Sequence, residues 1–326
     1  MLKKVIIVLC ALNLVGCAYN GILWDTAATN CQTNIPTQQP TSPTTTEYIV
    51  PTSEQTETQL SATQPTYCET VPSLQIVQPE PRDEDFVLVK NYIPDIVVDL
   101  RYATDNNFTN QKIYDFSDAW LRYGTVKKLA SVQKELKEFG LYLKIWDGFR
   151  PPSAQYKLWN ACPDPTYVSD PNMGFSSHSR GNTVDITLVY ADGTELRMPT
   201  LFDDFSGLAD RDYSDCDSEA AQNAIFLEEL MKKHGFKPYA GEWWHFTDNQ
   251  QYLVDASFEP VEPILCYADC NEYISLRTAP STKAEAITSI ATGEQFCVIA
   301  YYDNFVLIEY KQLLGYVPLE YIQTID

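Results

Sequence analysis

The chain places a polar turn directly before a strand at Ser176-Ser177-His178-Ser179-Arg180-Gly181-Asn182-Thr183-Val184-Asp185-Ile186-Thr187-Leu188. Because side chains alternate across a strand, Val184, Ile186 and Leu188 would face a core while Asp185 would point to the opposite side. His178 lies on the turn, seven residues before Asp185. The segment therefore predicts a strand that presents an imidazole and a carboxylate away from the core.

A helix and a second strand are predicted upstream of this segment. Apolar residues recur at helical spacing over residues 126–139, and Gly140 follows as a stop signal. Apolar and other residues then alternate over residues 141–146, as they do in a strand. The turn that follows would present Arg150 at the end of this strand.

Two more helices complete the predicted domain. One begins at Ser153, and the other runs from Ser218 to its stop signal, Gly235. Strands beside helices without a strict βαβ rhythm indicate an α+β domain, with helices packed on a mixed or antiparallel sheet. We expect this domain to occupy residues 81–260.

Candidate metal ligands come from two distant segments. Gly241-Glu242-Trp243-Trp244-His245 adds an imidazole and an acid to His178 and Asp185. Two imidazoles and one carboxylate can hold zinc and leave its fourth position open for water, as a hydrolytic site requires. Glu242 could then take the proton from that water. The aromatic residues of this segment favour a strand, in which a bend would be needed to bring Glu242 and His245 to one side.

Each of these residues also has a purely structural interpretation. The sequence has only three histidines, and the remaining one, His234, lies at a helix end, where it would interact favourably with the last carbonyls. Arg150 could pair with a surface carboxylate, and Trp243 and Trp244 could simply belong to the core. The prediction of a catalytic site therefore rests on these motifs occurring together and not on any one residue.

Six sequence blocks follow one another along this domain: Asp99-Leu100-Arg101-Tyr102-Ala103-Thr104, Asn107-Phe108-Thr109, Asp147-Gly148-Phe149-Arg150-Pro151, Ser176-x-His178-x-x-Gly181-x-x-x-Asp185, Phe202-Asp203-Asp204-Phe205-Ser206 and Glu242-Trp243-Trp244-His245. Taken together, they resemble the zinc D-alanyl-D-alanine dipeptidase family associated with vancomycin resistance, over essentially the whole domain. The first two blocks point to the dipeptidase branch, and the last two catalytic blocks are shared with wider D-Ala-D-Ala metallopeptidases and phage endopeptidases.

The resemblance implies a role for each matching residue. One Zn²⁺ per chain would be held by His178, Asp185 and His245. Glu242 would act as general base and then acid, and Arg150 would stabilise the oxyanion. Ser176 and Asp203 would bind the substrate, with Asp203, or its neighbour Asp204, as the partner of the free amino group.

The N-terminus has the features of an export signal. Residues 1–16 combine a short basic start with an apolar run of eleven residues, too short to span a bilayer. The end of this segment resembles a bacterial lipoprotein box, which implies that Cys17 is lipidated and becomes the first residue of the mature protein. The alternative is cleavage elsewhere, with Cys17 an ordinary thiol. Residues 17–80 are rich in Thr, Ser, Pro and Gln and predict a disordered tether.

Residues 263–326 predict a second, all-β domain. Short strands broken by turns are expected at 274–281, 287–293, 296–301, 305–310 and 315–318, as in a small barrel. Leu276-Arg277-x-x-Pro280-Ser281, Gly293-Glu294 and Gly315-Tyr316-Val317 resemble bacterial SH3-like domains, which commonly accompany cell-wall hydrolases and bind wall peptides. A role as spacer or protein-contact module is the alternative.

Composition narrows the partners. The formal net charge of −21 argues against nucleic acid as a partner, because such binding needs a basic surface that neutralises the phosphate backbone. Without Cys10 and Cys17, seven of the nine cysteines remain, an odd number that leaves one unpaired or bonded to another chain. Candidate pairs are Cys31 with Cys68, Cys162 with Cys216, and Cys266 or Cys270 with Cys297.

These features together predict an exported, lipid-anchored zinc peptidase that faces the cell wall and hydrolyses D-Ala-D-Ala in cell-wall peptide metabolism. One alternative within the same class is a carboxypeptidase or endopeptidase that acts on peptidoglycan stem peptides. Another is a surface binding protein that keeps the fold without turnover. The complete set of ligands, Glu242 and Arg150 favours an enzyme, because binding alone would not need all of them.

The lipoprotein prediction can be tested at Cys17. Cys17→Ala should block lipidation, because eleven apolar residues alone do not hold a mature chain in lipid. The protein should move from the membrane fraction to a precursor or soluble pool, as followed by fractionation and immunoblotting. Mature Cys17→Ala protein retained in the membrane would contradict the prediction.

Overall fold

The computed structural model describes residues 77–325. The predicted signal, Cys17, Cys31, Cys68 and nearly all of the predicted tether lie outside these residues, so these predictions are not tested by the structure. Within the described part of the chain, no helix has the length and apolar character needed to cross a membrane.

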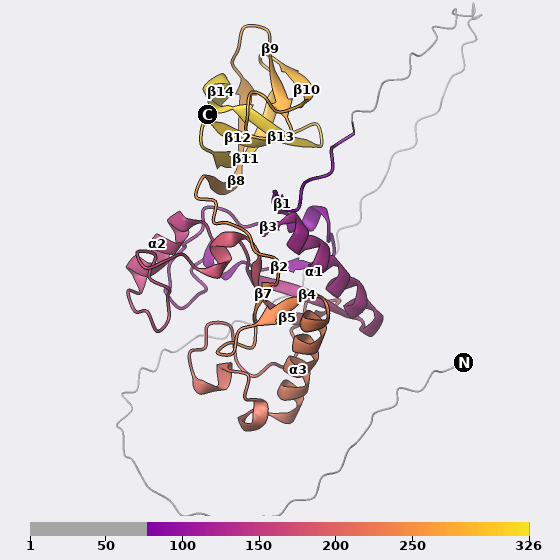
Figure 1. The fold of residues 1–326 in the computed structure, drawn as a ribbon, viewed down its shortest axis with the longest axis vertical. Coiled ribbons are helices and arrows are strands. Elements are labelled where there is room, and N and C mark those ends of the chain that lie inside the picture. Colours follow the sequence, from indigo (N-terminus) through magenta and orange to yellow (C-terminus); the bar gives the residue numbers. More distant parts are fainter. Residues whose placement is uncertain (1–76, 326) are drawn as a thin grey trace, which may run out of the picture. The chain divides into compact units, whose positions relative to one another are not determined.

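A five-stranded sheet forms the centre of the first domain (Figure 1). Its order is β2-β4-β5-β7-β6, in which β2 pairs with β4 in parallel and the other pairs are antiparallel. The sheet is therefore mixed, and with its helices it confirms the predicted α+β class. The strands are β2 (Val97–Val98), β4 (Leu141–Asp147), β5 (Thr183–Tyr190), β6 (Phe236–Pro238) and β7 (His245–Asp248).

Three α-helices accompany this sheet: α1 (Tyr123–Leu136), α2 (Pro152–Ala161) and α3 (Ser218–Lys233). They match the three predicted helices closely. After α1 a 3₁₀ turn leads to Gly140, whose φ of 72° lies in the left-handed region that glycine adopts without strain.

The remaining elements of this domain are short. Strand β1 (Phe86–Leu88) pairs with β3 (Trp120–Arg122) in a separate antiparallel ribbon. The 3₁₀ helices are η1 (Val89–Asn91), η2 (Arg101–Ala103), η3 (Lys137–Phe139), η4 (Ser177–Arg180), η5 (Gly207–Ala209) and η6 (Tyr213–Asp215), and η7 (Leu319–Tyr321) lies in the C-terminal region.

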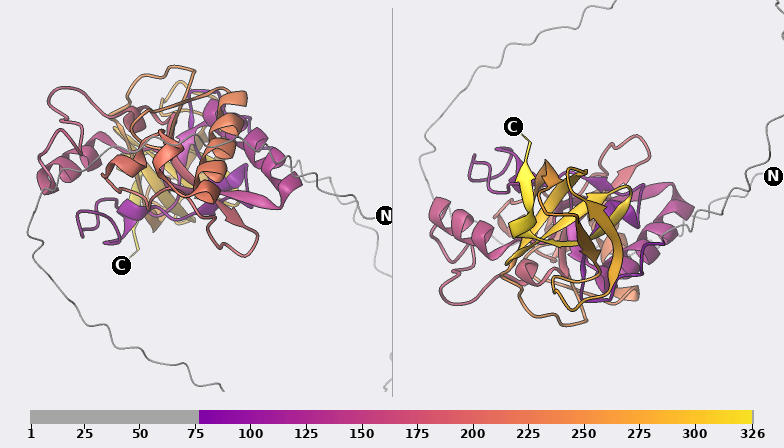
Figure 2. Two further views of the ribbon diagram at one scale, coloured as in Figure 1. Left: turned by 90° about the horizontal axis from the view of Figure 1, so that it is seen from below. Right: turned by 90° about the horizontal axis from the view of Figure 1, so that it is seen from above.

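The C-terminal region is a seven-stranded sheet of order β10-β9-β13-β12-β11-β8-β14, whose strands curl around one another in Figure 2. All-β structure was predicted here, and the five predicted strands are present. The structure adds β8 and β14. Strand β8 escapes prediction because it contains Pro260 and Pro263, which normally argue against a strand. The strands are β8 (Phe258–Ala268), β9 (Tyr273–Arg277), β10 (Ala286–Ala291), β11 (Gln295–Tyr302), β12 (Phe305–Tyr310), β13 (Leu313–Pro318) and β14 (Ile322–Thr324).

The start of β8 is packed into the core of the first domain. Phe258 is fully buried and stacks on Phe86, with ring centroids 4.3 Å apart and planes 6° from parallel. The rings of Phe149 and Trp120 lie 5.7 and 5.3 Å from it. The loop that carries Arg150 directly after Phe149 is therefore supported from behind by apolar packing.

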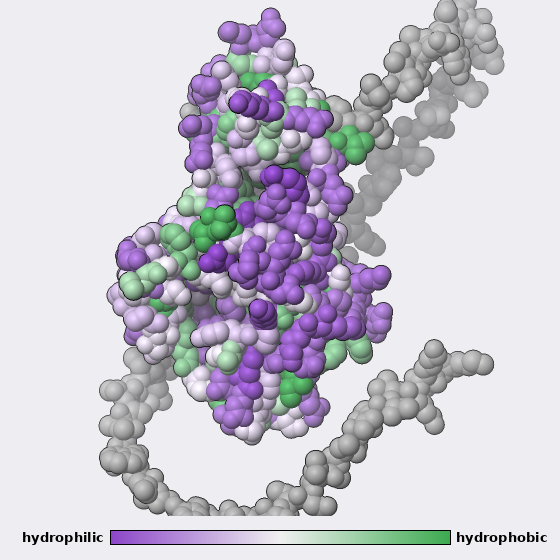
Figure 3. Space-filling model, viewed as in Figure 1, coloured by the Kyte–Doolittle hydropathy of each residue, from purple (hydrophilic) through white to green (hydrophobic). Residues whose placement is uncertain are grey.

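All five cysteines in the described part of the chain are free thiols: Cys162, Cys216, Cys266, Cys270 and Cys297. The candidate disulfides among them are thus not formed in this structure. The face shown in Figure 3 is largely hydrophilic with a few scattered apolar side chains, in keeping with an acidic chain that carries its charge on the surface.

Candidate active site

A cavity of about 320 Å³ gathers most of the predicted site residues. Strands β5 and β7 lie side by side here, and Asp185 is paired with His245 in their register. This pairing brings together two segments that are about 60 residues apart in sequence. Among the lining residues are Tyr102, Arg150, Tyr167, Ser176, Ser177, His178, Asp185, Asp203, Phe205, Tyr239, Glu242 and His245.

His178 is buried and held in one orientation. Its Nδ1 lies 2.9 Å from the carbonyl oxygen of Gly148, so Nδ1 carries the proton and donates to that oxygen. Its Nε2 is then left with a lone pair, 3.4 Å from Oδ2 of Asp185. In histidines that bind metals, the ring nitrogen that does not bind the metal typically donates a hydrogen bond, which fixes the tautomer in this way.

Asp185 lies between the two imidazoles. Its Oδ1 is 3.1 Å from Nδ1 of His245, yet it is buried without a hydrogen-bond partner in the described structure. The candidate ligand atoms of His178, Asp185 and His245 all lie within 4.8 Å of one another. A buried carboxylate oxygen without a partner between two imidazole nitrogens fits a cation, so these three residues can hold a metal ion.

The protonation of these groups is linked to metal binding. Burial alone would raise the pKa of Asp185, but the imidazoles of His178 and His245 hold it below its ordinary value. Burial lowers the pKa of His245, but the carboxylates of Asp185 and Glu242 outweigh this effect and raise it to about 9. A metal ion must displace this proton, so the affinity of the site for metal increases as the pH rises toward about 9.

Glu242 reaches the same side as His245 through a turn. Strand β7 begins only at His245, so the expected strand over 241–244 is wrong, while the expected bend is present. The backbone N–H of His245 donates to the carbonyl oxygen of Glu242 at 3.4 Å and closes the turn. Oε2 of Glu242 lies 3.3 Å from Nδ1 of His245, and its side chain is 31% exposed. The carboxylate is thus beside the ligand set and open to water.

Arg150 is a buried cation rather than a surface ion-pair partner. Its Nη2 and Nε donate to Oδ2 of Asp147 at 2.6 and 3.2 Å, and its Nη1 donates to Oε1 of Gln155 at 3.0 Å. Burial lowers the pKa of Arg150, but Asp147, Tyr114 and Tyr102 more than offset it, so the pKa lies well above its ordinary value. This network uses three of the five N–H bonds of the guanidinium, and Arg150 lines the cavity.

The structure separates Asp203 from Asp204. Asp203 lines the cavity and its Oδ2 accepts a hydrogen bond from the Tyr102 hydroxyl at 2.9 Å. Oδ1 of Asp204 instead accepts from the backbone N–H of Ser206 at 2.8 Å. Burial raises the pKa of Asp203 well above its ordinary value, and the carboxylate of Asp185 adds to this effect. Asp203 is therefore the carboxylate of this pair that lines the cavity, and no Lys, Arg or His in the described part of the chain forms an ion pair with it.

The remaining predicted residues lie as follows. Ser176 lines the cavity, and its Oγ caps η4 by accepting from the backbone N–H of His178 at 3.3 Å. His234 lies at the end of α3, with Nε2 3.0 Å from Oε2 of Glu135, outside the ligand set. His234 is therefore placed as a structural residue at a helix end and not as a metal ligand.

Three residues near the site had no role assigned from the sequence. Asp147 accepts hydrogen bonds from Arg150, and the hydroxyl of Tyr114 donates to Oδ1 of Asp147 at 2.5 Å. The hydroxyl of Tyr102 donates to Asp203. Two of them stand inside motifs that carry the family resemblance, Asp147 beside Arg150 and Tyr102 in the Asp-Leu-Arg-Tyr block. Tyr114 carries no such signal.

Comparison with known proteins agrees with this geometry. The family model described as D-ala-D-ala dipeptidase (Peptidase_M15) matches residues 82–263. The chain belongs to this family of metallopeptidases. The bacterial SH3 domain model matches residues 272–323, so the peptidase is followed by a bacterial SH3 domain.

Several D-alanyl-D-alanine dipeptidases are similar to this peptidase. The Escherichia coli K12 protein is 37% identical over 153 residues, which cover 47% of this chain and 79% of that protein. The Streptomyces coelicolor protein is 30% identical and the Enterococcus faecalis V583 protein 29% identical; each match covers 54% of this chain, with 96% and 97% of the relatives. A solved structure, "VanYB in complex with D-Alanine-D-Alanine", is 18% identical with a TM-score of 0.28, covering 40% of this chain and 73% of that one; similarity of this size carries no functional argument.

The ligand set can be tested by metal analysis. His178→Ala and His245→Ala should each lose the bound metal, because two remaining ligands hold an ion poorly. The measurement is the metal content of the purified protein by inductively coupled plasma mass spectrometry. His234→Ala is the matched control and should keep its metal. Full metal occupancy in His245→Ala would show that the ligand set is wrong.

Proposed function

We propose that this chain is an exported zinc dipeptidase that hydrolyses D-Ala-D-Ala. The observation that carries the proposal is the convergence of His178, Asp185, His245, Glu242 and Arg150 on one cavity of about 320 Å³. A surface binding protein would have no need for a base and a buried guanidinium beside three metal ligands. The similarity to dipeptidases supports the choice of substrate.

Zinc fits the donor set best. Two imidazoles and one carboxylate are ligands that zinc uses in hydrolytic sites, and the buried oxygen of Asp185 has no other partner in the described structure. The chemistry that bound zinc supplies here is Lewis-acid polarisation of the scissile carbonyl.

The protein's own groups perform the remaining tasks. Glu242, exposed to water at the cavity, takes the proton of the attacking water and returns it to the leaving amine. Arg150 stabilises the negative charge that develops on the carbonyl oxygen. Because Asp147 and Gln155 already fix the guanidinium, little reorganisation is needed when that charge appears.

Asp203 sets the preference for a free dipeptide. Its partly buried carboxylate has no cation bonded to it, and the hydroxyl of Tyr102 is its only hydrogen-bond partner in the described structure. The free ammonium group of a dipeptide would give it a charge-assisted hydrogen bond, and Ser176 would contribute a further polar contact. An acylated nitrogen would leave this carboxylate without that partner.

For the place of action, we propose the cell membrane, with Cys17 lipidated and the enzyme facing the cell wall, in cell-wall peptide metabolism. The apolar run of residues 5–15 and the Thr/Ser/Pro-rich segment after Cys17 support this assignment. The second candidate is a carboxypeptidase or endopeptidase that acts on peptidoglycan stem peptides. The bacterial SH3 domain favours it, because a free dipeptide needs no wall-binding module.

Glu242→Gln separates the base from the metal ligands. The substitution removes a proton acceptor but no metal ligand, so zinc should remain bound while turnover falls by about 10² to 10⁴, the range for general acid–base groups. The measurements are metal content and released D-Ala. Near-normal turnover would mean that another group acts as the base.

The substrate is tested with three compounds at equal concentration: D-Ala-D-Ala, its N-acetyl form, and a stem pentapeptide ending in D-Ala-D-Ala. The free dipeptide should be cleaved at least about a hundredfold faster than the acetylated form, because acylation removes the charge that pairs with Asp203. Asp203→Asn should reduce this ratio, and Asp204→Asn is the matched control. Preferential cleavage of the pentapeptide would establish the second candidate instead.

A further inference from the structure

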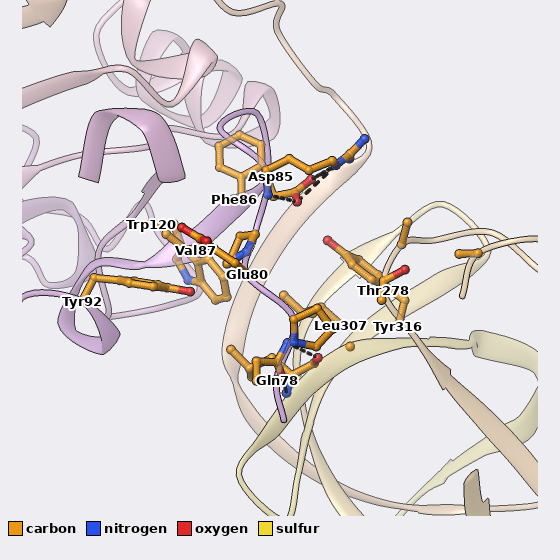
Figure 4. A pocket seen from close by; sticks show the side chains of 17 residues that line it. Gln78, Glu80, Asp85, Phe86, Val87, Tyr92, Trp120, Thr278, Leu307 and Tyr316 are labelled. Carbon is orange, nitrogen blue, oxygen red and sulfur yellow. Dashed lines mark hydrogen bonds and ion pairs between the residues drawn. The ribbon is translucent and has the colours of Figure 1, made fainter. Parts of the chain in front are cut away.

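A second cavity, of about 350 Å³, lies apart from the catalytic residues and shares none of its lining with them (Figure 4). One wall is the segment 78–82, another is the β1–β3 ribbon with Tyr92, and the third comes from the bacterial SH3 domain. Gln78 ties the first wall to the third, because its side chain accepts from the N–H of Leu314 at 2.7 Å and donates to the carbonyl oxygen of Leu314 at 3.0 Å. Its size falls within the usual range of pockets for small ligands.

Aromatic and aliphatic side chains make up much of the lining. Phe86, Tyr92, Trp120 and Tyr316 contribute rings, and Val87, Leu307 and Leu314 contribute aliphatic groups. Figure 4 shows Tyr92 and Trp120 on one side of the cavity and Tyr316 on the other. Such a lining accepts an apolar stem, and aromatic faces also attract cations.

The charged groups of the cavity do not balance. Asp85 is paired with Arg82, whose Nη2 lies 2.6 Å from Oδ1 of Asp85. Glu80 also lines the cavity, but its hydrogen bond comes from a neutral group, the hydroxyl of Tyr123 at 3.0 Å. No Lys, Arg or His of residues 77–325 forms an ion pair with Glu80, so one negative charge remains without a cation.

The carboxylate of Asp85 acts on hydroxyls from both sides of the cavity. Burial raises the pKa of Tyr92, and Tyr123, Glu80 and Asp85 add to the effect. Burial also raises the pKa of Tyr316, with Asp85 the next cause. Both phenols therefore stay neutral near pH 7, so the charge that a guest meets comes from the carboxylates and Arg82.

We propose that this cavity binds an ammonium group carried on an apolar stem, with the charge at Glu80 and the stem among the aromatic side chains. An anion would meet the uncompensated carboxylate, and a neutral guest of the same shape would gain only the apolar contact. The same chemistry occurs in a free alkylamine and in the side chain of a lysine residue within a peptide.

Calorimetric titration of the full chain tests the site. The probes are n-pentylamine, Nα-acetyl-lysine amide and, as the uncharged counterpart of the latter, Nα-acetyl-norleucine amide. At least one amine should bind. Comparison of n-pentylamine with the lysine compound shows whether the guest is a free amine or a peptide side chain, and comparison of the lysine and norleucine compounds shows whether the charge is required. Glu80→Gln should weaken amine binding at least about tenfold, or about 1.4 kcal/mol.

Two further variants make the result decisive. Glu84→Gln is the matched control, because Glu84 also lies near Arg82, at 3.3 Å, but does not line the cavity; binding should be unchanged. Ala284→Phe places a ring in the cavity while leaving Glu80 in place, and should abolish amine binding. Equal binding of the norleucine compound and the amines, unchanged binding in Glu80→Gln, or no binding of either amine at about 10 mM would each overturn the proposal.

Discussion

The buried carboxylate of Asp147 holds the catalytic side of the cavity together. It accepts hydrogen bonds from the guanidinium of Arg150, the hydroxyl of Tyr114 and the backbone N–H of Gly148. The carbonyl oxygen of Gly148 in turn accepts a hydrogen bond from Nδ1 of His178, so one side chain links Arg150 to the orientation of a candidate metal ligand. A shift of this carboxylate would disturb both at once, because charge-assisted bonds in a buried network depend on one another.

The position of Asp147 follows from the sheet. It is the last residue of β4, beyond an irregularity in the pairing with β5 between Ile145 and Asp147, and it stands opposite Asp185. Irregularities of this kind redirect side chains near strand ends. Behind the loop, Phe149 packs on Phe86 with ring centroids 4.3 Å apart, and Phe258 packs on both. The polar network therefore rests on an apolar layer to which the first residue of β8 contributes.

Much of this arrangement is predictable from sequence because it depends on local patterns. Alternation in residues 183–188 and helical spacing in residues 126–139 locate the strand and helix correctly, and the order of motifs identifies the family. Contacts between distant segments are not visible in such patterns. Tyr114 bonding to Asp147 and the packing of Phe258 arise only when the chain folds. Strand β8 was not predicted because Pro260 and Pro263 argue against a strand. Both lie where β8 pairs with β11 alone, since β14 pairs only with residues 266–268.

The candidate active site contains more carboxylates than permanently charged cations. Asp147, Asp185, Asp203 and Glu242 bring four carboxylates close together, whereas Arg150 is the one permanently charged cation among residues 77–325 that lines the cavity. Asp147 already pairs with Arg150, so Asp185 and Glu242 share the imidazoles and Asp203 stands without a positive partner. Burial is the main cause of the raised pKa of Asp203, with the carboxylate of Asp185 adding to it, whereas the carboxylates of Asp185 and Glu242 raise the pKa of His245 to about 9. A divalent metal at the imidazoles and an ammonium group at Asp203 would neutralise the excess negative charge at two separate points. Under the proposed function, a substrate with a free amino group would supply the second charge itself, and the site would favour short, unblocked peptides over acylated ones.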